Sequence, residues 1–159
     1  MSLLDKEAVK RSEKALKDFD QSMSVIILSN SGRTANDAAS VLKCEVGAII
    51  KSLLFKADST FILSLVAGDR RCSLNKMKKI IDMNNLSMAS PEEVKSKTGY
   101  TIGGVSPIGH ISSIRILIDN SLNRFVNLYA AAGHPNCVFK INFENLQKIT
   151  NGEIKEIAE

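Results

Sequence analysis

Residues 49–66, with the sequence IIKSLLFKADSTFILSLV, decide the fold. Residues 49–56 and 60–66 are two apolar runs, and the turn-forming pair Asp58-Ser59 lies between them. Two such runs joined by a short polar turn are typical of an antiparallel hairpin. We therefore expect this hairpin at the centre of a sheet.

Helix and strand signals surround the hairpin on both sides. Apolar residues at helical spacing predict a first helix over residues 4–19, which Ser2 can cap. Further capping residues predict helices that begin after Thr34, Ser73, Ser90 and Asn142. Short apolar runs predict a buried strand over residues 25–28 and strands over 114–118, 126–131 and 138–141. Strands in both hairpin and helix-separated pairs indicate an α+β domain with a mixed sheet.

The chain has the length and composition of one soluble domain. Its 159 residues are 44% apolar and 24% charged, and no apolar run approaches the roughly 20 residues that span a bilayer. We expect residues 1–159 to form a single domain, with residues 1–20 as an N-terminal helix and no membrane association. Three cysteines without CxxC spacing, and a charged N-terminus, predict reduced thiols in a cytoplasmic protein. The net charge of +4 permits a polyanionic partner.

Lys51 is the one charged residue on its face of the first predicted strand. The period-two rule places it on the same face as Ile49, Leu53 and Phe55. An isolated ammonium in a dry core loses its proton, so Lys51 must reach an edge, pair with an acid or line a pocket. The pattern alone supports an edge lysine and a pocket lysine equally.

Residues 103–110, GGVSPIGH, form a loop rich in glycine and proline. Glycine allows close approach of a ligand to backbone N–H and C=O groups, and Pro107 stiffens the turn. Such a loop suits recognition of a small polar group by backbone atoms. It matches neither the dinucleotide fingerprint nor the phosphate loop, and an ordinary surface connection is the alternative.

Other reactive residues give weaker signals. His110 and His134 lie in turns, where an imidazole can bind substrate, transfer a proton or cap the turn. A zinc site that uses His134 and Cys137 would need a further ligand, so we expect no metal. Arg70, Arg71, Lys76, Lys78 and Lys79 form the densest basic stretch, which can contact phosphates or simply cover a solvated helix face.

Three segments together resemble the YbaK/ProX family of aminoacyl-tRNA deacylases. They are residues 46–55 around Lys51, the turn Ala67-Gly68-Asp69-Arg70-Arg71, and Thr98-Gly99-Tyr100 leading into the Gly-rich loop. Their order and spacing also match, and the resemblance runs from about Ser29 to the final helix. The family is related to the editing insertion domain of bacterial prolyl-tRNA synthetase.

The resemblance implies a fold, an activity and a site. The implied fold is a barrel-like mixed sheet with flanking helices, and the implied activity is hydrolysis of the ester on a mischarged aminoacyl-tRNA, without metal or nucleotide cofactor. Lys51 falls on the essential lysine of the family. The implied substrate-binding residues are Gly103, Gly104, Val105, Ser106, Pro107, Gly109, His110, Gly133 and His134.

The same resemblance suggests the substrate and the partners. We expect a trans-editing enzyme that acts on a small amino acid such as Ala, Cys, Ser or Thr, with aminoacyl-tRNA and prolyl-tRNA synthetase as partners. Arg70, Arg71, Lys76 and Lys79 are the expected tRNA contacts, and the chain is expected as a monomer or weak homodimer. The alternative function is a non-catalytic module that binds the tRNA end or a synthetase.

Overall fold

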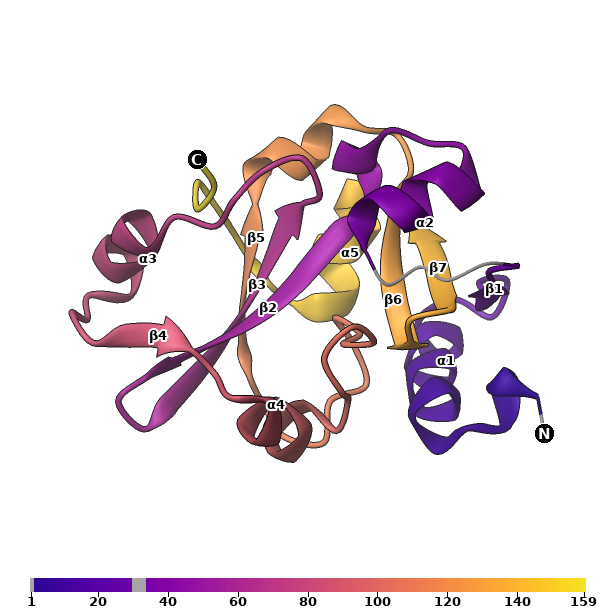
Figure 1. The fold of residues 1–159 in the computed structure, drawn as a ribbon, viewed down its shortest axis with the longest axis horizontal. Coiled ribbons are helices and arrows are strands. Elements are labelled where there is room, and N and C mark those ends of the chain that lie inside the picture. The colour runs from indigo at the N-terminus through magenta and orange to yellow at the C-terminus, as the bar shows by residue number, and fades with distance from the viewer. Residues whose placement is uncertain (1, 30–33) are drawn as a thin grey trace.

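The computed structural model describes residues 2–29 and 34–159. Within them the chain folds into two sheets with α-helices around them (Figure 1). The larger sheet has the strand order β4-β2-β3-β5-β8, and the smaller has the order β1-β7-β6. The α+β prediction is confirmed, with two separate sheets in place of the single barrel-like sheet that the resemblance implies.

The predicted hairpin is the centre of the larger sheet. Strands β2 (Ile50–Ala57) and β3 (Thr60–Ala67) pair antiparallel along their whole length, with Ile50 opposite Ala67. Asp58 in the turn has a φ of 54°, a left-handed conformation that aspartate tolerates. Alternate residues of β3 enter two different apolar clusters, which explains why its sequence is almost continuously apolar.

Three further strands complete the larger sheet. β5 (Arg115–Asp119) pairs parallel with β3, and β8 (Glu153–Lys155) pairs parallel with β5. β4 (Leu86–Met88) pairs only with the last three residues of β2. The sequence did not predict β4 and β8, because three-residue strands are too short to show a period. Since β4 is short, the first half of β2 has an edge without a strand partner in the part of the chain that the structure describes.

The smaller sheet differs from the sequence prediction at two places. It contains β1 (Ile26–Ile27), β6 (Leu128–His134) and β7 (Cys137–Ile141). The prediction of a buried strand over 25–28 is wrong, because only two residues pair and both are at least 36% exposed at the sheet edge. Val126 was expected in a strand but is 84% exposed and lies before β6. The two sheets meet at a bridge between Ile49 and Tyr129.

The described α-helices, apart from the first, begin at the capping residues that the sequence indicates. The α-helices are α1 (Glu7–Phe19), α2 (Ala35–Leu42), α3 (Leu74–Ile81), α4 (Pro91–Thr98) and α5 (Phe143–Thr150). The expected first helix is divided, because Ser2 caps a short 3-10 turn, Leu3–Asp5, and α1 starts after Lys6. Two other 3-10 turns are Val46–Ala48 and Asn120–Arg124.

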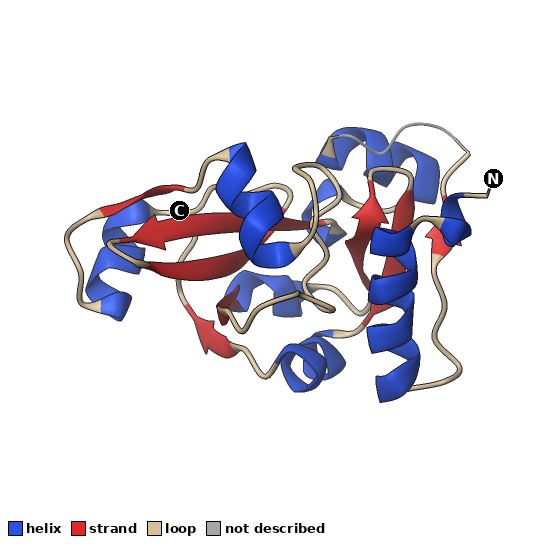
Figure 2. Ribbon diagram, turned by 90° about the horizontal axis from the view of Figure 1, so that it is seen from below, coloured by secondary structure: helices blue, strands red, loops and turns tan. Residues whose placement is uncertain are grey.

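The helices flank the sheets. Helix α1 packs against β6 of the smaller sheet, as the second view shows (Figure 2). None of the described helices is both long and apolar enough to cross a bilayer.

Candidate functional site

A cavity of about 240 Å³ lies where the two sheets meet. Its walls come from the unpaired half of β2, from β6 and β7, from α2 and from the start of the Gly-rich loop. The lining residues are Thr34, Ala35, Ala38, Ile49, Ile50, Lys51, Ser52, Leu53, Ile102, Gly103, Val105, Tyr129, Ala130, Ala131, Pro135 and Val138. Among these described residues Lys51 alone carries a charge, so its ammonium dominates the electrostatics of a mostly aliphatic space.

The Lys51 ammonium is held in place by a backbone carbonyl. It donates a hydrogen bond to the carbonyl oxygen of Arg70, in the loop between β3 and α3. Partial burial lowers the pKa of Lys51, and the nearby Asp69 carboxylate opposes this effect. Lys51 is therefore a fixed cation donor at the cavity wall, with two further N–H bonds that a ligand can use.

An ion pair stabilises the loop that carries Arg70. The Arg124 guanidinium contacts both carboxylate oxygens of Asp69, at 2.8 and 3.0 Å, and this pair holds the pKa of Asp69 below its usual range. The Gly68 N–H also donates to the Ile49 carbonyl at 2.7 Å. Asp69 was visible in the motif at residues 67–71, but its partner Arg124 is 55 residues away and no local pattern links them.

The first half of the Gly-rich loop faces the cavity. Gly103 and Val105 line it, and Gly103 has a φ of 94°, which favours glycine. Gly104 touches the smaller sheet, because its carbonyl accepts from the Gly133 N–H at 3.0 Å. A side chain at Gly104 would place Cβ 2.9 Å from the His134 nitrogen. The Gly104 N–H donates to Thr101, whereas those of Gly103 and Val105 bond to no other described residue.

The second half of the loop is packed against α1. The Ser106 hydroxyl lies 2.8 Å from that of Ser12, and both residues are fully buried. The Arg11 guanidinium donates to the Gly109 carbonyl at 2.8 Å. Pro107, Gly109 and His110 border a different cavity, between α1 and α5, so the structure does not bring them to Lys51.

The two histidines both serve turns of the backbone. His110 contacts the Ser106 carbonyl through Nε2 at 2.7 Å, and burial lowers its pKa. His134 accepts a hydrogen bond from the Asn136 N–H on Nδ1 at 3.0 Å, inside the turn between β6 and β7. Gly133 and His134 are absent from the cavity lining, whereas the next residue, Pro135, contributes to it.

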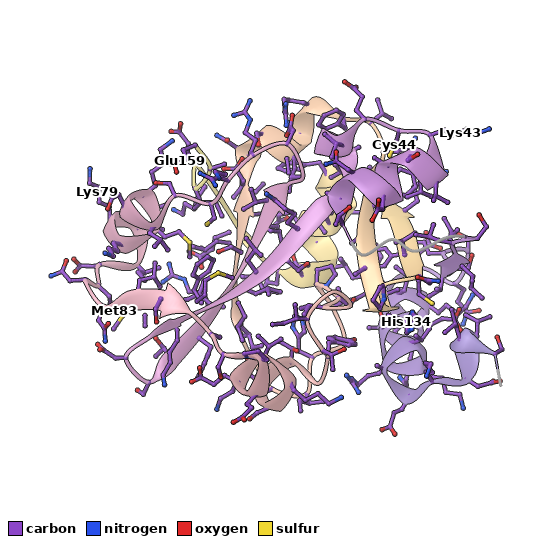
Figure 3. All side chains as sticks on the ribbon, in the orientation of Figure 1. Lys43, Cys44, Lys79, Met83, His134 and Glu159 are labelled. Atoms are coloured by element: carbon purple, nitrogen blue, oxygen red, sulfur yellow. The ribbon has the colours of Figure 1, made fainter. Side chains whose placement is uncertain are left out.

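The four basic residues expected to contact tRNA do not form one cluster beside the cavity. Arg70 and Arg71 are exposed close to Lys51. The Lys76 ammonium is engaged by the Ala158 carbonyl at 2.7 Å and by Glu156 at 3.3 Å. Lys79 lies on α3, on the opposite side of the molecule from His134 (Figure 3).

The Cys72 thiol lies close to Lys51 and is partly buried. Burial raises the pKa of Cys72 to about 11, so its thiolate is scarce at neutral pH. In the described ranges, no three His, Cys, Asp or Glu side chains are grouped so that they could hold a metal ion.

Sequence reasoning chose Gly133 and His134 from the smaller sheet and missed the part of that sheet that lines the cavity. Tyr129, Ala130, Ala131 and Val138 belong to it, and Ile102, 61% exposed, stands at its rim. The three consecutive alanines at 130–132 were an available signal, because small side chains in a strand leave room beside the sheet.

Several known proteins share part of this sequence. Residues 29–149 match the family model described as the aminoacyl-tRNA editing domain. The chain is 35% identical to a proline--tRNA ligase of Bacillus velezensis over 113 residues, which are 70% of the chain and 20% of the ligase. It is 31% identical to the Bacillus subtilis ligase over 127 residues, 80% of the chain and 22% of the ligase. The chain thus spans about a fifth of the length of these relatives.

A solved structure covers nearly the whole chain. A crystallised protein, described as a proposed trans-editing enzyme for prolyl tRNA synthetase, superposes with a TM-score of 0.91 at 33% identity. The match covers 97% of this chain and 98% of that one.

Proposed function

We propose that this chain, which belongs to the family of aminoacyl-tRNA editing domains, hydrolyses the ester between a small amino acid and the terminal adenosine of a mischarged tRNA. The observation that carries the proposal is the Lys51 ammonium, fixed by the Arg70 carbonyl as the one charge among the described residues that line a mostly aliphatic cavity bordered by glycine backbone. The cavity volume is below the 300–1,000 Å³ of drug-sized pockets, which favours a small aminoacyl group.

Lys51 acts as a cation in the proposed reaction. The two N–H bonds that engage no other described residue contact the ester or the ribose hydroxyls and hold the reacting carbonyl in one orientation. A neutral Lys51 would serve as a general base, and burial favours that form. The Asp69 carboxylate and the Arg70 carbonyl both favour the charged form, so we prefer the cation.

Water attacks the ester carbonyl, and the loop backbone stabilises the oxyanion that forms. The ester bond to the ribose oxygen then breaks, and a proton of the attacking water passes to that leaving oxygen. Gly104 is unsuited to this role because its N–H is already bonded to Thr101. The N–H groups of Gly103 and Val105 remain as donors to the developing negative charge. No step in this scheme uses a side-chain nucleophile.

The substrate partner is aminoacyl-tRNA, and prolyl-tRNA synthetase is a second proposed partner. Arg70 and Arg71 are exposed beside the cavity and supply positive charge for phosphates of the acceptor end. The likeness to a region inside proline--tRNA ligases supports both partners.

A deacylation panel tests the proposal. Purified protein is incubated with tRNAs charged with Ala, Cys, Ser, Thr or Pro, and with a free ester of each amino acid. We expect rapid hydrolysis of at least one small aminoacyl-tRNA and little hydrolysis of the correctly charged Pro-tRNA. Binding to the tRNAs without turnover would favour the alternative function of a non-catalytic module. Equally fast hydrolysis of the free esters would show that the enzyme does not need the tRNA part of the substrate.

A further inference from the structure

We propose that the C-terminal segment, residues 156–159, is a positioning element for Lys51 and that buried Asp119 anchors it. This inference rests on the proposed function, because it assigns a role in the same reaction. The segment lies outside the cavity and contacts no atom that would react. Its effect passes through the loop that carries the Arg70 carbonyl.

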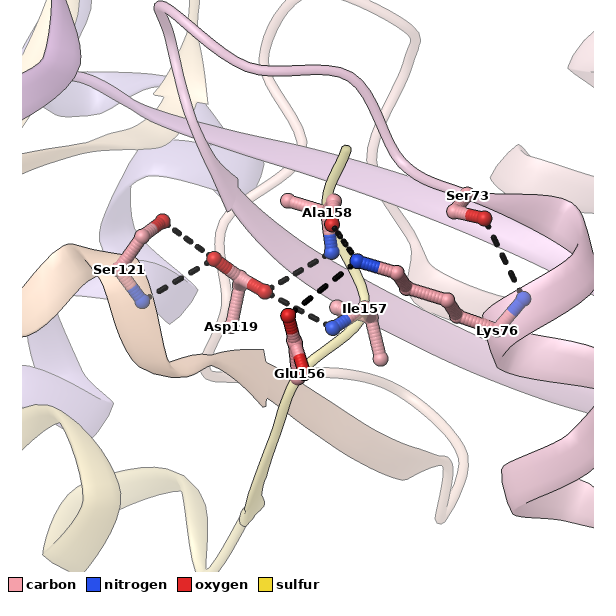
Figure 4. A network of polar contacts seen from close by, with 7 residues as sticks. All are labelled: Ser73, Lys76, Asp119, Ser121, Glu156, Ile157 and Ala158. Atoms are coloured by element: carbon pink, nitrogen blue, oxygen red, sulfur yellow. Dashed lines mark hydrogen bonds and ion pairs between the residues drawn. The ribbon is translucent and has the colours of Figure 1, made fainter.

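Asp119, at the end of β5, holds the segment by two backbone hydrogen bonds. Its side chain is 1% exposed, and Oδ1 accepts from the N–H groups of Ile157 at 2.8 Å and Ala158 at 2.9 Å (Figure 4). Oδ2 accepts from the Ser121 N–H and hydroxyl. A buried carboxylate with four donors is stable only while all of them stay in place, so the segment and β5 are strongly coupled.

The segment in turn pairs with the loop after β3. The Ser73 N–H donates to the Ile157 carbonyl at 2.7 Å, and the Glu159 N–H donates to the Arg71 carbonyl at 2.8 Å. Between these bonds Cys72 and Ala158 form an antiparallel bridge. The loop thus gains a short strand as a partner along residues 71–73.

Arg70 directly precedes this paired stretch. Its carbonyl is the acceptor for the Lys51 ammonium, so the position of that acceptor depends on how firmly residues 71–73 are held. The Asp69–Arg124 ion pair restrains the loop on the other side of Arg70, but both side chains are about a third exposed. Ile157 is fully buried, so water screens the hydrogen bonds of Asp119 less than it screens the Asp69–Arg124 ion pair. The restraint through Asp119 is therefore the stronger of the two.

Two variants remove the anchor by different routes. Asp119→Asn places an amide donor opposite an existing donor, and Ala158→Pro removes one N–H that Asp119 accepts. The matched control is Glu156→Gln in the same segment, because it weakens only an ion pair whose Glu156 side chain is 70% exposed. The full chain is used throughout, and thermal melting identifies temperatures at which every variant is folded.

The first readout is the lysine NMR spectrum of protein labelled with ¹³C at Cε. The Lys51 signal is assigned as the one that disappears in Lys51→Arg. We expect it to have its own chemical shift in the wild type and in Glu156→Gln, and to move toward the exposed lysines in both anchor variants. This readout needs no substrate, so it tests the inference even if the chain proves to hydrolyse nothing.

The second readout is single-turnover deacylation of the tRNA that the wild type hydrolyses. We expect both anchor variants to lose roughly 10- to 100-fold in the rate constant with the half-saturating enzyme concentration unchanged, because a small displacement of a positioned group has effects of this size. Anchor variants that melt at lower temperature, yet keep the Lys51 signal and the wild-type rate while folded, would overturn the inference and leave the segment a purely structural role.

Discussion

The two halves of the Gly-rich loop have similar composition and opposite surroundings. Gly103 and Val105 line the cavity beside Lys51, and their N–H groups have no bond to another described residue. Residues 106–110 pack against α1, with the first three buried and the last two half-buried, and their polar groups are engaged by Ser12, Arg11 and Tyr100. The resemblance assigns both halves to substrate binding, whereas the geometry favours that role for the first half and a scaffold role for the second.

This difference shows what a glycine-rich motif can and cannot indicate. Glycine is needed wherever backbone must come close to another group, and the sequence does not say whether that group is a ligand or another part of the protein. Helix α1 makes the difference here, because it packs against the second half of the Gly-rich loop and not against the first. This helix lies outside the family match at residues 29–149.

Substitution of one glycine in each half gives the largest contrast. At Gly109, φ is 70° and an alanine Cβ would lie 2.7 Å from the Tyr100 hydroxyl and 2.9 Å from the Arg11 carbonyl. We expect Gly109→Ala to lower the free energy of unfolding by roughly 3 kcal/mol, from strain and overpacking together. Chemical denaturation measures this loss, and activity should fall only with the folded fraction.

Gly103→Ala is the counterpart in the half that faces the cavity. Its Cβ would meet nothing closer than Pro135 at 3.5 Å, so only backbone strain of about 1–2 kcal/mol is expected. The deacylation rate of the folded variant should nevertheless fall, because the loop backbone moves. If Gly109→Ala reduced the rate more than Gly103→Ala at equal folded fraction, the division of the loop would be wrong.

The buried Ser12–Ser106 pair gives a smaller effect. Ser106→Ala leaves the Ser12 hydroxyl without this contact and the Ile108 N–H without its acceptor, both in a buried place, and we expect a loss of about 2 kcal/mol in stability. The double variant Ser12→Ala/Ser106→Ala should be less destabilised than the sum of the two single variants, since no orphaned hydroxyl remains. Additive losses in urea titrations would mean that the contact contributes nothing.

His110 gives the smallest effect, which depends on pH. Burial lowers its pKa in the folded state, so the unfolded chain binds a proton more readily as pH falls below about 6.5. The stability that neutral His110 contributes is therefore present above that pH and is lost as pH falls. Between pH 7 and 5 the melting temperature should fall less for His110→Gln than for the wild type. Equal falls in melting temperature would contradict the argument that burial lowers the pKa of His110.

Local signals predicted much of the fold. The hairpin at residues 50–67 and the caps Thr34, Ser73, Ser90 and Asn142 follow from short-range patterns, and the structure has them. Local signals could not predict the cavity, because its walls come from β2, β6, β7 and α2, which meet only in the tertiary structure. Pattern reasoning left Lys51 undecided between edge and pocket, and only the resemblance joined it to the loop.

Residues far apart in sequence were invisible for the same reason. Local patterns assign no role to Asp119 or Arg124, yet Asp119 anchors the C-terminal segment and Arg124 pairs with Asp69. The two members of each pair are too far apart in sequence to be linked by a helical or strand period. Such pairs need either a structure or correlated changes among relatives.

The most direct test of the central claim compares two lysines of β2. Lys51→Ala removes the cavity cation, and Lys56→Ala removes a lysine of the same strand that pairs with Glu93 outside the cavity. Single-turnover deacylation of the preferred aminoacyl-tRNA is measured for both, with circular dichroism to check the fold. We expect Lys51→Ala to lose about 100-fold or more and Lys56→Ala to stay within about twofold of the wild type. A folded Lys51→Ala variant with the wild-type rate would contradict the account.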